Sequence, residues 1–221
     1  MTMSRPYLLA LACAVGLSLV PAPSAGAQDA RLQARVDGRT RAQLQPILDS
    51  ARVAGIPLEP LVDKALEGAT KGASRPRIVD AVRTLSKALG AARVALGGVA
   101  SDAEIVAAAD ALEAGIRPGQ LGYLRNLRTN RPITVPLAVL ADLVARGVPP
   151  DTAAQAVLVL ARAGAVDAQF IGLRIDVERD IGSGIAPVTA VVMRSEASVR
   201  AQATRNALEN PVAGQEAVPT P

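Results

Sequence analysis

One short phrase of four or five residues constrains this chain more than any other feature of its sequence. An apolar run ends at a glycine, an isoleucine or valine follows, and a proline comes within the next two residues. The phrase occurs at Gly55, Gly115, Gly147 and Gly184. Glycine adopts the left-handed conformation that ends a helix, whereas proline suits the first turn of the next helix. The sequence therefore predicts a string of helices joined by tight turns.

The apolar residues between these turns recur at helical spacing. The clearest stripe advances by alternating steps of four and three residues, through Ile78, Val82, Leu85, Leu89, Ala92 and Leu96. Such a stripe places one narrow apolar face against a neighbouring helix. Ser101 and Glu104 form a capping box that opens another helix. Alternating strand patterns are weak. We therefore predict an all-α protein built as an irregular, solenoid-like stack of helical hairpins, with a compact multi-helix bundle as the alternative.

The beginning of the chain has the pattern of a secretory signal peptide. Arg5 precedes an apolar run over residues 7–20, and Ala25-Gly26-Ala27 supplies small residues for cleavage. We expect residues 1–27 to be removed, and the product to be periplasmic or secreted by a bacterium. Residues 28–39 are predicted to be a flexible lead or a frayed first helix. No later segment reaches transmembrane length.

The rest of the chain is predicted to form two helical units and a tail. The first unit covers residues 40–97, and Gly97-Gly98 is the expected boundary because paired glycines precede a fresh helix cap. The second unit covers residues 101–208. Residues 209–221 contain several prolines and few large apolar groups, so we expect them to be a disordered tail.

The composition excludes several kinds of chemistry. The chain has no histidine, and its one cysteine, Cys13, lies in the predicted signal peptide. Imidazole bases, serine triads, thiol nucleophiles and sites built on histidine or cysteine ligands are therefore excluded from the mature protein. The formal net charge of +4 comes without a basic run and with few aromatic residues, which argues against nucleic-acid binding. We expect no catalytic residue, no cofactor and no metal site.

Two places in the sequence are candidates for an interaction site. Lys64, Glu67 and Lys71 are spaced to share one helical face. They would form either a binding spot for an acidic partner or, as we favour, ordinary surface ion pairs. Tyr123 and Phe170 are the aromatic residues after the signal segment. We expect both rings to anchor the core, and a carbohydrate- or peptide-binding role for Tyr123 is the alternative.

Three classes of function fit these observations. We favour an exported structural or interaction module of the cell envelope, whose partner is another protein. The first alternative is an envelope enzyme that uses Asp, Glu, Ser and Arg. The second alternative is a binder of anionic envelope polymers through distributed arginines. The carboxylates of Asp176 and Asp180 lie four residues apart, but flanking arginines favour a solvated helix face over an acid–base pair.

Overall fold

The computed structural model describes residues 25–209, which are helical throughout apart from the connecting turns, with no strand in that range. The prediction of an all-α protein is confirmed. The helices are α1 (Ala25–Arg35), α2 (Gly38–Val53), α3 (Glu59–Thr70), α4 (Arg75–Leu96), α5 (Asp102–Glu113), α6 (Pro118–Leu127), α7 (Thr134–Ala145), α8 (Pro150–Arg162), α9 (Asp167–Gly182) and α10 (Pro187–Glu209). Most of the predicted signal peptide and most of the predicted tail lie outside the described residues.

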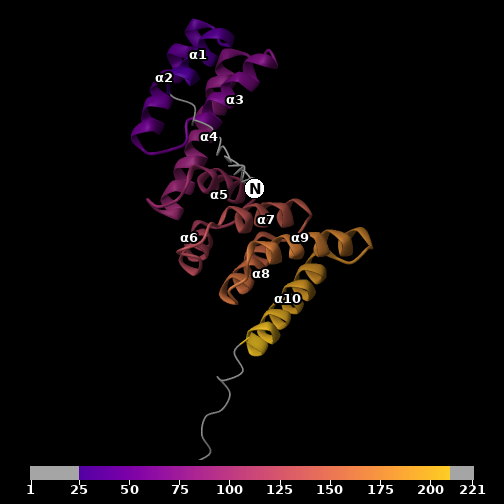
Figure 1. Cartoon of the computed structure of the whole chain (residues 1–221). Helices are drawn as coiled ribbons and strands as arrows, with labels where there is room; N and C mark the ends of the chain where they lie inside the picture. Colours follow the sequence, from indigo (N-terminus) through magenta and orange to yellow (C-terminus); the bar gives the residue numbers. More distant parts are fainter. Residues whose placement is uncertain (1–24, 210–221) are drawn as a thin grey trace, which may run out of the picture.

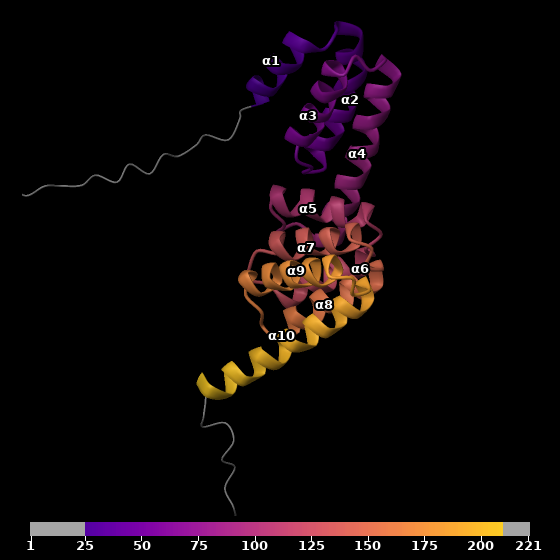
Figure 2. The same cartoon turned by 90° about the vertical axis from the view of Figure 1, so that its right-hand side faces the viewer.

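The helices form an elongated assembly that runs from α1–α3 at one end to α10 at the other (Figures 1 and 2). Three consecutive hairpins, α5/α6, α7/α8 and α9/α10, stack on one another. Within the stack, α5 contacts α7 and α7 contacts α9, while α6 contacts α8 and α8 contacts α10. Each hairpin thus contributes one helix to each of two layers. This is the predicted stack of hairpins, with α1–α3 grouped at its beginning.

Helix α4 joins the two parts of the assembly. It packs against α2 and α3 on one side and against α5 and α6 on the other. Its predicted apolar stripe is buried at Ile78, Val82, Leu89, Ala92 and Leu96, with Leu85 partly buried. Packing is therefore continuous across the predicted boundary near Gly97. The division into two units stays a prediction.

The recurring phrase is a helix-ending motif followed by a helix start. All four phrase glycines have positive φ, from 65° at Gly55 to 94° at Gly115. The amide of Gly115 donates to the carbonyl of Leu112 at 3.0 Å, and that of Ile116 donates to Ala111 at 3.0 Å. This pair of bonds defines a Schellman motif, in which the residue after the glycine packs against the closing helix. The isoleucine or valine of the phrase is that packing residue, and Ile116 is indeed buried.

A proline at the first residue of α8 and of α10 also lies close to the turn of the preceding hairpin. Helices α6, α8 and α10 each begin at the phrase proline or the residue after it. A β-carbon placed on Gly115 would lie 3.2 Å from Cγ of Pro150, and one on Gly147 would lie 3.6 Å from Cγ of Pro187. The turn of one hairpin therefore rests on the first residue of the next hairpin's second helix. The same phrase that ends a helix helps to set the distance between hairpins.

Two local expectations need correction. For residues 28–39 the flexible lead is wrong and the alternative of a first helix is closer: residues 28–35 belong to α1, which packs on α3 and buries Leu32, with Val36 buried just beyond its end. Tyr123 is not a core anchor, because its side chain is 40% exposed, whereas Phe170 is fully buried as expected.

Candidate functional site

The predicted cluster on α3 is an ion-pair network. Lys64 donates to one oxygen of Glu67 at 3.1 Å, and Lys71 donates to the other oxygen at 2.5 Å. The hydrogen bonds from Lys71 and Lys64, together with their charges, lower the pKa of Glu67. All three side chains are open to water, which screens both pairs, so they contribute little to stability. The structure thus brings these residues together in the arrangement that we favoured from the sequence.

A small cavity of about 120 Å³ adjoins this cluster where α3 meets α4. The aliphatic part of its lining includes Gly68 and Ile78, and the guanidinium of Arg77 adds a third positive charge at its rim. A β-carbon on Gly68 would come within 2.9 Å of Ile78, so the two helices already approach closely here. The cavity is therefore too small for more than a single side chain.

Tyr123 forms the most distinctive exposed feature of the stack. It projects from α6 and meets Arg162 of α8, whose Nε donates to the tyrosine hydroxyl at 3.1 Å. The guanidinium carbon also lies 5.2 Å from the centre of the ring, within cation–π range. The pair places an aromatic ring, a hydroxyl and a positive charge together on the surface of the layer that contains α6, α8 and α10.

A shallow groove lies between α8 and α10 on the same layer. Its volume is about 180 Å³, and its lining comprises Thr152, Gln155, Ala156, Val159, Val192, Ser195 and Glu196. Val159 and Val192 are 37% and 41% exposed, so the groove has an apolar component from each helix. Val159 lies three residues before Arg162, on the same side of α8. We call the surface formed by Tyr123, Arg162 and this groove the α6–α8–α10 surface.

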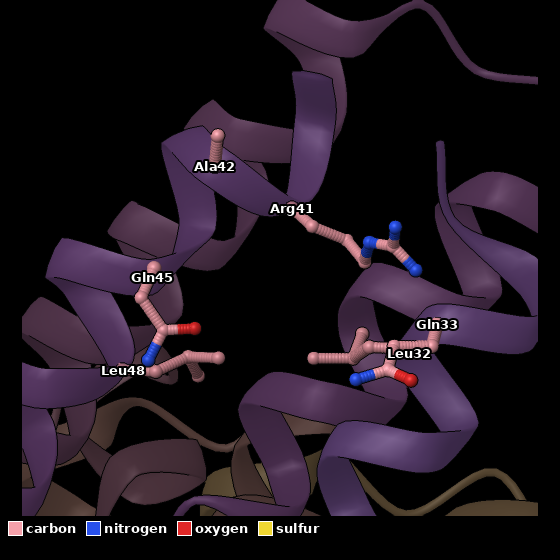
Figure 3. A pocket seen from close by; sticks show the side chains of 6 residues that line it. All are labelled: Leu32, Gln33, Arg41, Ala42, Gln45 and Leu48. Atoms are coloured by element: carbon pink, nitrogen blue, oxygen red, sulfur yellow. The ribbon is translucent and has the colours of Figure 1, made fainter. Parts of the chain in front are cut away.

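A larger cavity of about 380 Å³ opens between α1 and α2 (Figure 3). Leu32 of α1 and Leu48 of α2 face each other across it, and both are buried. Gln33 and Gln45 contribute amide groups, and the side chain of Arg41 extends into the space between the helices. The cavity therefore combines an apolar floor with polar and cationic groups at its edge.

The buried charged residues are occupied by structural contacts. Glu104 accepts hydrogen bonds from the amides of Ser101 at 2.9 Å and Ile133 at 2.8 Å, and it is paired with Arg125. Burial favours the neutral acid, but these hydrogen bonds and the charge of Arg125 outweigh it and lower the pKa of Glu104. Glu104 therefore joins α5 to α6 and to the start of α7. Its partners leave no lone pair directed toward an open site.

Two further pairs connect helices in the same way, one between hairpins and one within the α9/α10 hairpin. Arg128, at the end of α6, donates to the carbonyl of Ala165 at 2.6 Å and to Asp167 at 2.5 Å, and it lies over the ring of Phe170. Asp180 of α9 binds Arg194 of α10 through both oxygens, at 2.6 and 2.7 Å. The hydrogen bonds from Arg194 lower the pKa of Asp180, although burial opposes the shift.

The pair Asp176 and Asp180 shows no shared role. Asp176 pairs with Arg179 at 2.7 Å on the surface, whereas Asp180 is buried against Arg194. Each carboxylate is thus neutralised by a different arginine. Across residues 25–209, no group of three or more Asp, Glu, His or Cys side chains is arranged to hold a metal ion. Within the same range, no helix has both the length and the apolar character needed to cross a membrane.

Comparisons of this chain with protein-family models, with curated proteins and with solved structures gave no match. A function is therefore inferred from the geometry of the molecule. Sequence reasoning named Tyr123 but missed Arg162 and the valines beside it. Tyr123 and Arg162 are 39 residues apart in the sequence, so no local pattern indicates their contact, which depends on how α6 and α8 stack.

Proposed function

We propose that this protein is a non-enzymatic interaction module of the bacterial cell envelope that binds another protein through the α6–α8–α10 surface. One observation carries the proposal: the exposed Tyr123–Arg162 pair lies on the same layer as a groove lined by the partly exposed Val159 and Val192, and Arg162 is one helical turn from Val159 on α8. Tyrosine and arginine are enriched at the energetic centres of protein interfaces. Stacked hairpins also present extended surfaces that suit this use.

The rigidity of this surface supports a binding role. Tyr123 and Arg162 come from neighbouring hairpins, and the buried Arg128 contacts hold the end of α6 to the start of α9. A surface whose side chains are already ordered loses less conformational entropy when a partner binds. The groove supplies hydroxyl and amide groups that can bond to a partner's backbone, alongside the apolar contacts.

Site-specific photo-crosslinking in the native host tests this function. A photoreactive phenylalanine analogue at Tyr123 or Val159 should capture one discrete partner protein. The same analogue at Ala138, an exposed position of α7 in the opposite layer, is the matched control. We expect a specific product from the two positions on the α6–α8–α10 surface and none from the control. Equal capture from all three positions would refute this surface as the binding face.

Export is the second part of the proposal. It rests on the signal-peptide pattern in residues 1–27, most of which lie outside the described residues. N-terminal sequencing of the protein recovered from the envelope should give Gln28 as the first residue. An intact Met1, or a lipid on Cys13, would contradict the proposed processing without bearing on the binding surface.

A further inference from the structure

The cavity between α1 and α2 is lined by Arg41, a positive charge that stabilises no other part of the described chain through an ion pair. Arg41 is half-buried, and among the described residues it has no ion pair and no side-chain hydrogen bond. Arg31 pairs with Glu59 and Asp63, and Arg52 pairs with Asp49 at 2.7 Å. Arg35 and Arg39 form no ion pair among the described residues either, but neither of them lines the cavity. Arg41 instead extends toward the space between the helices (Figure 3).

The surroundings of Arg41 favour an anion. The two carboxylates nearest in sequence already have donors: Asp37 accepts from the backbone and hydroxyl of Thr40, and Asp49 accepts from Arg52 and Gln45. Neither of these residues lines the cavity. One terminal nitrogen of the Arg41 guanidinium lies near Gly38, the first residue of α2: a β-carbon added to Gly38 would be 3.6 Å from it. The positive end of the helix dipole adds to the charge there.

The rest of the cavity favours an aliphatic group. Leu32 and Leu48 form its floor, and Ala42 borders it. Its volume of about 380 Å³ falls within the range of about 300–1,000 Å³ that small-molecule pockets occupy. Gln33 and Gln45 are the remaining polar groups of the lining, and their amides can hydrogen-bond to a head group.

We propose that this cavity binds a small carboxylate that carries an aliphatic chain. The carboxylate pairs with Arg41 and bonds to the glutamine amides, while the chain lies on Leu32 and Leu48. Free fatty acids and the C-terminal leucine of a peptide share this chemistry. The site lies at the other end of the molecule from the α6–α8–α10 surface, so it is independent of the function proposed above.

Calorimetric titration of the full mature chain at low ionic strength tests the site. The probes are hexanoate, hexanol and hexylammonium, which share one chain and differ in the head group. We expect hexanoate to bind at least about tenfold more tightly than hexanol, because a charge-assisted hydrogen bond to Arg41 is available only to the acid. Hexylammonium should not bind. A peptide that ends in leucine, compared with its C-terminal amide, shows which source of carboxylate fits better.

Three variants connect the binding to the cavity. Arg41→Gln should weaken hexanoate binding about tenfold while leaving the unfolding midpoint unchanged, because Arg41 has no ion pair to lose among the described residues. Arg39 lies two residues before Arg41 and does not line the cavity. Arg39→Gln removes the same charge outside the site, so it should have a much smaller effect on hexanoate binding. Ala42→Phe should block the site by filling it. Equal affinity for hexanoate and hexanol, or unchanged hexanoate binding in the Arg41 variant, would overturn the proposal.

Discussion

Replacing the turn glycines by alanine tests the central structural argument. A left-handed conformation costs an alanine about 1–2 kcal/mol relative to glycine. At Gly72, where φ is 65° and no atom lies within 4 Å of an added β-carbon, this strain is the whole expected effect. We therefore expect Gly72→Ala to lower the free energy of unfolding by about 1 kcal/mol.

Gly115 should be more sensitive than Gly72 because a second cost is added. Its φ is 94°, and an added β-carbon would lie 3.2 Å from Cγ of Pro150, which is closer than ordinary van der Waals contact. The rigid ring of a proline at the start of α8 has little freedom to move away. Overpacking of this kind costs at least about 1 kcal/mol, so Gly115→Ala should cost about 2–3 kcal/mol in all. At Gly147 the corresponding distance of 3.6 Å is an ordinary contact, and the cost should match that at Gly72.

The side chain that replaces glycine should also matter. Asparagine tolerates the left-handed region, so Gly115→Asn should cost less than Gly115→Val, in which a β-branched side chain adds about a further 1 kcal/mol. Gly172 is the matched control, because it lies inside α9 without positive φ and has no atom within 4 Å of an added β-carbon. Gly172→Ala should stabilise the protein by up to about 1 kcal/mol.

Urea unfolding followed by far-ultraviolet circular dichroism measures these changes. Adding Pro150→Ala to Gly115→Ala should restore about 1 kcal/mol in a double-mutant cycle, since it removes the steric part of the cost but not the backbone strain. If alanine stabilises the protein at Gly115 as it does at Gly172, the turn assignment is wrong. If the costs at Gly115 and Gly72 are equal, the contact between successive turns does not affect stability.

Three further predictions concern the buried charges and the aromatic rings. Glu104→Ala should cost about 3 kcal/mol in urea unfolding, because it leaves Arg125 buried without its partner, and the added change Arg125→Met should recover part of that loss. The pKa values of Glu104 and Asp180 are lowered in the folded protein. The stabilisation from these carboxylates is therefore present above their unfolded pKa values of about 4 and is lost as the pH falls through the folded values. The urea concentration at the unfolding midpoint should decrease once the pH falls below about 5, and it should decrease less steeply in Glu104→Gln. Phe170→Ala should cost about 3–5 kcal/mol, whereas Tyr123→Ala should cost about 1 kcal/mol or less, and similar losses from the two would contradict their different burial.

The sequence by itself determined the class of fold and the positions of the turns. Each phrase glycine is a local signal, because a positive φ and a following proline depend on only a few adjacent residues. Gly72 and Gly164 end helices in the same way without the complete phrase, and their bonds to residues three positions back repeat the motif. The heptad-like stripe of α4 likewise predicted its buried face, since helical periodicity is a property of neighbouring turns.

Only the tertiary structure decided which surfaces are open and which charges meet. Tyr123 is exposed because α6 directs Leu121 and Leu124 into the core and leaves the tyrosine on the opposite side, beside Arg162 of the next hairpin. Glu104 belongs to a capping box that the sequence shows, but its bonds to Arg125 and Ile133 depend on where α6 and the start of α7 lie relative to α5. The cavity at Arg41 exists because α1 packs beside α2, whereas the polar sequence of residues 28–39 left a flexible lead and a frayed helix equally open. The contacts of Glu104 and Tyr123 join residues more than 20 positions apart, where local periodicity carries no information.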